Sequence, residues 1–502
     1  MSGISVVMML IALDQTIVGT ALPRMVAELQ GFDLYPWVAA SYLLTTAIFI
    51  PLTGRLGDLY GRKPFLLSAI IIFLASSVLC GQADSMMALV LARGLQGIGG
   101  GMLIGCAFAS VSDLFPFPFD RIKWQVMLSA SFGIASAVGP GLGGWITEQW
   151  GWRNVFYVNA PIGLVALALV WRFLPWVVHN EQTRKSMDWL GVVWMILAIS
   201  SLLGCTEFGE QLGLTSASFV ILVLFSVACI YGFFRHQIKT DAPVIPARLL
   251  NDPVVRRLML LALVTGLIMF VLIYYAPLLL QGGFSMSPNE AGIIITPIIA
   301  LVTVGSILNG RLLTRIKKPE LLFSYGGIAL ILSLLGLCLI NRHTPNWMMM
   351  SLFAISGLSL GFQLPNLVVQ IQAAVSPADQ GAASALIQTL RTIGSMLGAS
   401  LAGVMVSLGF KQGLAPTISK ISNEQGTILD LLASPQVLLR TEDQEMLYKL
   451  SSTHGFDANL LMEQARLGLV SGIHQAFFMC LILALIGYVI SLKLPNFLNK
   501  NN

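Results

Sequence analysis

Charge is scarce in this chain. Asp, Glu, Lys and Arg make up 11% of the 502 residues, whereas a soluble domain carries roughly 25%. Hydrophobic residues make up 56%, and the mean hydropathy is +0.80. A chain so poor in charge and so rich in apolar runs is expected to be an all-helical protein that crosses the membrane many times.

Several classes of protein are excluded by what is missing. No Gly-Lys dipeptide occurs, so there is no phosphate-binding P-loop, and no polar segment is large enough for a soluble catalytic domain. The six cysteines all lie in apolar runs, so we expect no disulfide, no metal site and no cofactor. No nucleophile–base set is evident, which argues against an enzyme. The net charge of +5 comes from residues at the ends of apolar runs and does not indicate a nucleic-acid partner.

About fourteen apolar runs approach the roughly 20 residues that a membrane span requires. They lie near residues 3–24, 36–56, 64–83, 85–110, 124–148, 154–174, 187–208, 216–236, 256–281, 287–313, 320–340, 346–371, 377–409 and 468–492. An even number places both termini on one side. Nineteen of the 29 Lys and Arg residues flank the spans on that side, against three in the short loops opposite. This bias predicts a cell-membrane protein with both termini in the cytoplasm.

A weak internal repeat predicts the domain organisation. The segment 54–63 (GRLGDLYGRK) is echoed at 310–319, and 136–144 (SAVGPGLGG) at 395–403. Parallel repeats of this length indicate two six-helix bundles, at 1–174 and 256–492, with two inserted transmembrane helices at 187–236. The second bundle includes a polar outer loop, 410–467, which we expect to form a small outer cap of short helices.

Helix starts are marked by local signals. Ser287, Pro288 and Glu290 form a capping pattern at one predicted span, and Ser376-Pro377 begins another in the same way. Thr441-Glu442-Asp443-Gln444 predicts a short amphipathic helix within the outer loop.

Two ionisable residues lie inside predicted spans of the first half. Asp14 lies about eleven residues, or roughly 17 Å, into the first span, and Arg93 lies in the fourth. Charges are costly at this depth unless they pair or face water, so each is the best partner for the other. Gln96, one turn after Arg93, is placed to orient the pair. We expect proton coupling here, and the alternative is a purely structural ion pair.

Two further motifs predict helix locking and gating. The turn GRLGDLYGRKP contains Gly54, Asp58, Gly61 and Arg62, and Asp58 is placed to cap the helix that begins near Ser376. Arg62 and Arg121 are its candidate partners, and simple topology marking is the alternative. The fifth span is rich in small residues that let helices approach closely and contains a proline that kinks it. Those residues are Gly133, Gly139, Pro140, Gly141, Gly143 and Gly144.

Other polar and aromatic residues within spans are candidates for a substrate cavity, although ordinary packing or a place at the membrane interface is the better explanation for each of them alone. Arg391 is a second cation inside a span, and the sequence names no partner for it. The candidate set is Gln15, Tyr42, Gln96, Phe132, Tyr274, Tyr275, Gln363, Asn366, Gln388 and Arg391.

The motifs together carry a family resemblance. The order G-x-L-x-D-x-x-G-R-K resembles the loop between the second and third spans of major facilitator transporters, and the glycine-rich fifth span resembles the motif of their antiporter branch. LDQTIVGTALP, RGLQG, WRNVFYVNAPIG and ALIQTLRTIGSMLG extend the resemblance over nearly the whole chain. The chain looks like the fourteen-span drug:proton antiporters of the EmrB/QacA type.

The resemblance implies export of lipophilic drugs or toxic amphiphiles, driven by inward protons through alternating access. Spans nine to fourteen contain no acid apart from Glu290, Glu320 and Asp379 at helix starts, which favours neutral or singly charged substrates. One alternative is a dedicated exporter of a single metabolite, such as an antibiotic, lipid or siderophore. Another is an inner-membrane subunit that docks a periplasmic adaptor protein through 410–467, in a cell with two membranes.

Overall fold

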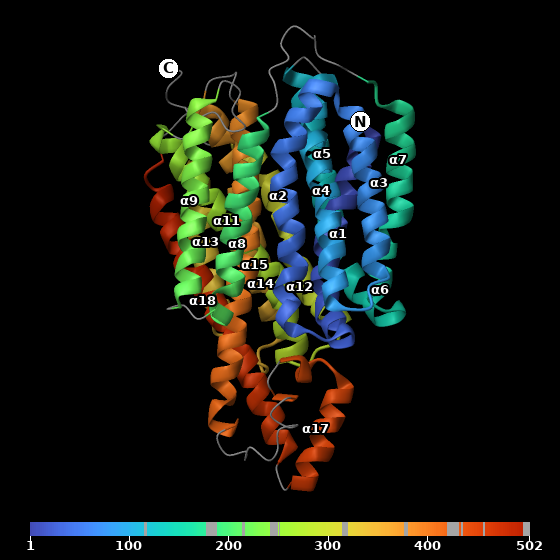
Figure 1. The fold of residues 1–502 in the computed structure, drawn as a ribbon, viewed down its shortest axis with the longest axis vertical. Helices are drawn as coiled ribbons and strands as arrows, with labels where there is room; N and C mark the ends of the chain where they lie inside the picture. The colour runs from blue at the N-terminus through green and yellow to red at the C-terminus, as the bar shows by residue number, and fades with distance from the viewer. Residues whose placement is uncertain are drawn as a thin grey trace.

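The computed structural model confirms the expected all-helical architecture in the residues that it describes (Figure 1). It describes residues 1–114, 118–176, 188–212, 216–240, 249, 251–313, 320–375, 380–418, 431–432, 435–454 and 457–494. Within these residues, eleven helices are long and apolar enough to cross a membrane.

The helices fall into two groups along the sequence, on either side of α8 and α9, and we call these groups the first and second bundles. The first contains α1 (Ser2–Leu29), η1 (Phe32–Leu34), α2 (Tyr35–Tyr60), α3 (Arg62–Gly81), α4 (Met86–Leu114), α5 (Pro118–Trp150), α6 (Arg153–Tyr157) and α7 (Asn159–Phe173). The second contains α11 (Pro253–Leu278), the π-helical turn η3 (Leu279–Gly283), α12 (Pro288–Leu313), α13 (Glu320–Leu337), α14 (Asn346–Ala374), α15 (Gln380–Ile418), η6 (Pro435–Leu438), α17 (Thr441–His454) and α18 (Ala458–Ser491).

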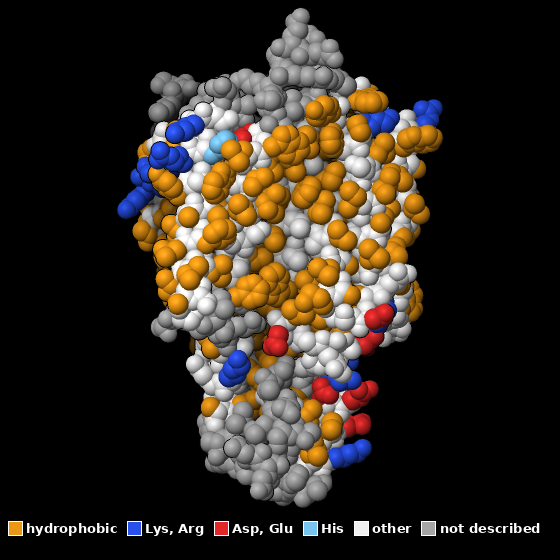
Figure 2. All heavy atoms as spheres, viewed as in Figure 1, with side chains coloured by type: hydrophobic (Ala, Val, Ile, Leu, Met, Phe, Trp, Pro, Cys, Tyr) orange, Lys and Arg blue, Asp and Glu red, His pale blue; other side chains and the backbone are white. Residues whose placement is uncertain are grey.

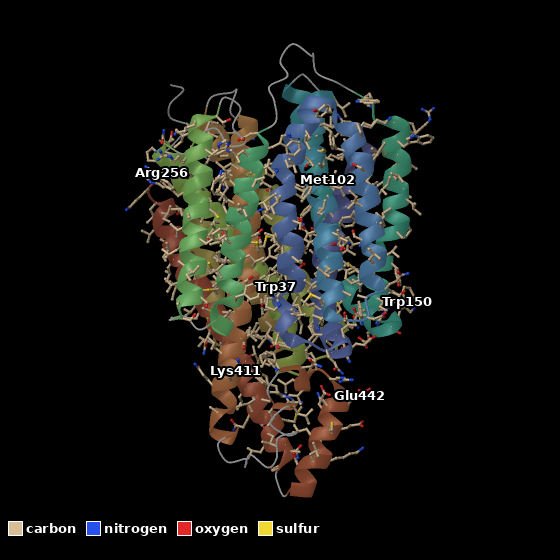
Figure 3. All side chains as sticks on the ribbon, in the orientation of Figure 1. Trp37, Met102, Trp150, Arg256, Lys411 and Glu442 are labelled. Carbon is tan, nitrogen blue, oxygen red and sulfur yellow. The ribbon has the colours of Figure 1, made fainter. Side chains whose placement is uncertain are left out.

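Two helices, α8 (Trp189–Leu212) and α9 (Ala217–Lys239), stand between the bundles in sequence and pack against each other. Helix α8 contacts both α2 of the first bundle and α15 of the second. The ring of Trp37 on α2 meets that of Phe208 on α8 at 5.9 Å between centroids (Figure 3). At the other end of the pair, Asp188 accepts hydrogen bonds from Gln237 of α9 and from the backbone N–H of Gly191. The insert therefore covers one seam between the bundles.

The predicted sixth span and the predicted outer loop differ from the structure at their boundaries. The span at 154–174 is broken at Val158 into α6 and α7. The segment 410–467 is not all loop, because α15 continues to Ile418 and α18 begins at Ala458. The projecting ends of these helices and α17 form what we call the cap, which contains the predicted helix at Thr441–His454.

Glycines explain why α15 and α18 extend beyond the bundle. Gly409 faces Gly472, and Gly413 faces Gly468, so the two helices cross with their backbones almost touching. A side chain at Gly472 would meet the Cα of Val406 at 2.7 Å. Two G-x-x-x-G pairs thus hold α15 against α18 at the base of the cap.

The surface has the character of a membrane protein. Hydrophobic side chains cover the middle of the molecule, and charged side chains gather toward its two ends (Figure 2). Helix α1 begins, and α18 ends, at the end of the bundles opposite the cap (Figure 1). Arg256 lies at that end, whereas Lys411 and Glu442 lie in the cap (Figure 3).

Helix starts follow their predicted caps where the structure describes them. The backbone N–H of Ser287 donates to Glu290 Oε2 at 2.9 Å, and that of Glu290 donates to Ser287 Oγ at 3.2 Å. This reciprocal pair confirms the capping box that begins α12. The second predicted start, Ser376-Pro377, lies outside the described residues.

The bundles are joined by hydrogen bonds on the cap side. Tyr35 Oη donates to the Tyr274 carbonyl at 2.8 Å, and Gln281 Nε2 donates to the Thr20 carbonyl at 3.0 Å. The backbone N–H of Gly31 donates to Gln436 Oε1 at 3.0 Å, so η6 in the cap also holds the first bundle.

Candidate functional site

An ion pair lies in the interior of the first bundle. Arg93 Nη1 of α4 donates to Asp14 Oδ2 of α1 at 2.9 Å, and both side chains are 0% exposed. Asp14 lies about 18 Å along α1 from its first residue, which is near the middle of a 30 Å hydrocarbon layer. The contact predicted from the sequence is therefore present, and the role of the pair stays a prediction.

Two amides complete the carboxylate's hydrogen bonds. Gln96 Nε2 donates to Asp14 Oδ1 at 2.8 Å, and Gln96 Oε1 accepts from Arg93 Nη1 at 2.7 Å. Asn159, the first residue of α7, donates from Nδ2 to Asp14 Oδ1 at 2.8 Å and to Ser77 Oγ at 3.0 Å. Gln96 thus bridges the two ions as expected, but Asn159 and Ser77 were not among the predicted residues.

Aromatic side chains cover the guanidinium. The Tyr42 ring of α2 lies under Arg93, 4.3 Å from Cζ to the ring centroid. Tyr274, from α11 of the second bundle, also interacts with Arg93 and is fully buried. Gln15 is half-buried and lies beside Tyr42. Tyr274 belongs to the opposite bundle, so side chains of both bundles surround the guanidinium.

This arrangement suits a carboxyl group that changes its charge. The pair is neutral as a whole and hydrogen-bonded, which is the condition for burying two ions. Removing one partner from such a pair typically costs 3–5 kcal/mol, because the other charge is left buried and alone. Arg93 stays charged, so a proton arriving at Asp14 would break the balance. Two atoms beside the pair, Arg93 Nη2 and Asn159 Oδ1, have no hydrogen-bond partner among the described residues.

Glycines let α5 pack closely against helices of both bundles. Gly139 lies against Thr16 of α1, with no room for a Cβ, and Gly143 faces Thr20 and Ile17 of the same helix. On the other side of α5, Gly133 faces Thr303 of α12 and Gly144 faces the Pro288 carbonyl. The Pro140 carbonyl in turn faces Gly292, where a Cβ would lie 2.5 Å from it, and a Cβ at Gly141 would lie 3.3 Å from Thr296 Oγ1. Close packing on both faces is thus what this motif provides.

The predicted gating turn joins α2 to α3. Gly61 has φ +85°, a backbone conformation that favours glycine, and Gly54 faces the Gly105 carbonyl of α4. Arg62 is buried and lies against Gly57. The side chains of Asp58 and Arg121 lie outside the described residues, so the expected contacts of Asp58 stay a prediction.

The other candidates do not converge on the ion pair. Phe132 packs against a small cluster around Ala12 and Leu13, and Tyr275 Oη donates to the Ala399 carbonyl at 2.6 Å. Asn366 donates to Asn309 Oδ1 at 2.9 Å, and Gln363 packs against Gly326 within the second bundle.

Arg391 and Gln388 are half-buried neighbours on α15. No ion pair within the described part of the chain involves Arg391. Within the same residues, no group of three or more His, Cys, Asp and Glu is arranged to hold a metal.

Comparison with known families identifies the chain. A model of the Major Facilitator Superfamily matches residues 4–399. The chain belongs to this superfamily. Like its relatives it is a transporter rather than an enzyme.

Curated relatives are similar over most of their length. The chain is 31% identical to the multidrug transporter protein MdtP of Bacillus subtilis, over 98% of this chain and 92% of that protein. It is 32% identical to multidrug resistance protein 3 of the same organism, over 85% and 82%.

Solved structures show the same fold at lower identity. A bacterial homologue of the human lysosomal transporter Spinster, in an inward-facing conformation, matches with a TM-score of 0.67 and 16% identity, over 98% of this chain and 95% of that one. A D-xylose–proton symporter matches with a TM-score of 0.57 and 16% identity, over 80% and 89%. These matches support the fold alone.

Proposed function

We propose that this transporter is a fourteen-span drug:proton antiporter of the EmrB/QacA type, which exports lipophilic amphiphiles across the cell membrane. The observation that carries the proposal is the fully buried Asp14–Arg93 pair. An acid that is buried inside a span and held by a cation and two amides is costly to keep unless its charge is used. Proton binding at Asp14 is the use that fits its position.

The proposed cycle has the proton and the guanidinium compete for Asp14. When Asp14 is ionised, Arg93, Gln96 and Asn159 hold it. When it is protonated, Arg93 loses its counter-charge and the contact with Tyr274 across the interface changes. The bundles then favour another arrangement, in which substrate is released and the proton is later lost to the cytoplasm.

The driving force is sufficient for such an exchange. Moving one elementary charge through 100 mV supplies about 2.3 kcal/mol, which corresponds to roughly a fifty-fold gradient of an uncharged substrate. A dication would need an acid deep inside a span of the second bundle to balance its charge. Glu290 in α12 does not provide this, because it lies at the start of the helix. The proposal therefore extends to neutral or singly charged substrates and not to dications.

Two features support the proposal. The glycines of α5 pack it against both α1, which carries Asp14, and α12 of the opposite bundle. The names of the relatives MdtP and multidrug resistance protein 3 support drugs as the substrate class.

The proposal includes an orientation in the membrane. Both termini would lie in the cytoplasm and the cap outside, where it offers a surface for a periplasmic adaptor if the cell has two membranes. Co-purification of an adaptor that is lost when α17 is deleted would support that partner.

The test is transport by purified protein in liposomes. An imposed pH gradient should drive uptake or efflux of at least one lipophilic dye or drug from a panel, and dissipating the gradient should stop it. Transport of one metabolite alone would point to a dedicated exporter, and flux indifferent to the pH gradient would contradict proton coupling.

A further inference from the structure

A groove lies on the second bundle, away from the ion pair of the first. It has a volume of about 740 Å³ and runs along α18, bordered by Cys338 just after α13 and Met405 of α15. Its α18 residues recur every three or four positions, so they share one face of the helix. They are Leu467, Val470, Ser471, His474, Gln475, Phe478, Met479, Ile482 and Leu483.

The groove opens toward the lipid. Leu467 and Phe478 are each 55% exposed, and both lie on α18, which is long and apolar enough to cross a membrane. The distance along α18 from Leu467 to Leu483 is about 24 Å, whereas one leaflet contributes about 15 Å of hydrocarbon. The groove is thus long enough to run from the membrane interface into the centre of the bilayer.

Its two halves differ in polarity. Ser471, His474 and Gln475 lie in the half nearer the cap, and Phe478 and Ile482 lie in the half nearer the midplane. Exposed polar side chains on a lipid-facing helix are costly unless they meet a polar group. The polarity of the groove is therefore complementary to a molecule with a polar head and an apolar tail.

His474 supplies an unused hydrogen-bonding atom. Its ring lies beside the backbone of Ile340, three residues after the end of α13. Its Nε2 is buried and has no hydrogen-bond partner among the described residues. Buried polar atoms are rarely left unpaired, so a partner from outside the chain is expected.

Cations stand at the cap end of the groove. Arg466 precedes Leu467, and its Nε is buried without a hydrogen-bond partner among the described residues. Arg342 is exposed and follows Ile340 by two residues. Glu463, an exposed acid, lies one turn before Leu467 on α18, so two cations and one acid of the described residues lie close in sequence to this end of the groove. An anionic head group matches this end.

We propose that the groove binds one anionic phospholipid from the leaflet on the cap side. Its acyl chain would lie along Phe478 and Ile482, and its phosphate would face Arg466 and His474. Met405 lines the groove, and its carbonyl faces Gly472, so the lipid would fill the space beside the α15–α18 crossing. This lipid is distinct from the transported substrate, and the inference does not depend on proton coupling.

Lipid retention measures this binding directly. The protein is reconstituted in nanodiscs of phosphatidylglycerol and phosphatidylcholine at 1:1, released, and weighed by native mass spectrometry. Wild-type protein should retain phosphatidylglycerol at least threefold above its bulk proportion. Arg466→Gln with His474→Leu should return the ratio to that of the bulk, and Ser471→Trp should remove the retained lipid by filling the groove.

A matched control distinguishes filling of the groove from the general effect of a bulky side chain on α18. Val489→Trp places the same ring at an exposed position of α18 that does not line the groove, and it should retain lipid as the wild type does. Each variant must elute as a single species. Equal enrichment in Ser471→Trp and wild type would overturn the proposal. So would complete displacement by palmitate, which indicates a single-chain carboxylate site, or a doubled mass without lipid, which indicates a second copy of the chain.

Discussion

Adding one methyl group at Gly139 should disturb the α1–α5 contact. A Cβ at this position collides with the hydroxyl of Thr16 and lies 2.7 Å from its Cβ. Overpacking of this kind costs about 1–3 kcal/mol. Thr16 follows Asp14 by two residues, or about 3 Å of helix, so the same displacement reaches the ion pair.

A second glycine provides the matched control. At Gly94 an added Cβ meets its nearest neighbour, Ser41 Cβ, at 3.9 Å, which is ordinary contact. Both Gly→Ala changes gain the same helix propensity, so the difference between them measures packing. We expect Gly139→Ala to be less stable than Gly94→Ala by about 1–3 kcal/mol in unfolding from mixed micelles, followed by circular dichroism.

A partner substitution tests the cause. Thr16→Ala removes the hydroxyl but keeps the Cβ, so it should restore only part of the stability that Gly139→Ala loses, and the two changes should be non-additive. Equal unfolding midpoints for Gly139→Ala and Gly94→Ala would refute the reasoning.

Three further predictions follow from single contacts. Asn159→Leu should leave the protein folded but reduce pH-driven flux by about tenfold or more, because Asp14 loses a hydrogen bond worth about 1.5–3 kcal/mol; wild-type flux would count against it. Gly472→Ala should increase proteolysis of the cap, whereas Gly487→Ala, whose Cβ has ordinary contacts of 3.6 Å, should not. Tyr35→Phe removes a hydrogen bond between the bundles and should make the cap-side interface more accessible to cysteine labelling; unchanged labelling would argue that this bond does not hold it.

The ion pair could be predicted because charges stand out in an apolar sequence. Asp14 and Arg93 had few other partners available, and the spacing of Gln96 placed it one turn away. Asn159 was missed because an uncharged amide gives a weak signal, although an asparagine just before a proline-containing apolar run was visible. Its position at the start of α7 depends on the break at Val158, which the hydropathy of the span does not indicate.

The long apolar helices could likewise be predicted from hydropathy, and a helical cap from the polarity of 410–467, but the extension of α15 and α18 into that cap could not. Polarity between 410 and 467 indicated a loop, whereas pairs of glycines let α15 and α18 continue beyond the belt. The G-x-x-x-G spacings at 409–413 and 468–472 were the available signal. Whether polar residues such as Gln363 line a cavity or pack within a bundle depends on helix rotation, which spacing alone leaves open.

The central claim is that Asp14 binds and releases the proton that crosses the membrane in exchange for substrate. In proteoliposomes loaded with a pH-sensitive dye and held at equal pH inside and out, an imposed gradient of a transported drug should move protons in the opposite direction. Asp14→Asn should bind the drug but move no protons, whereas Asp33→Asn, an exposed acid in η1, should behave as the wild type. Proton movement of wild-type size in Asp14→Asn would contradict the account.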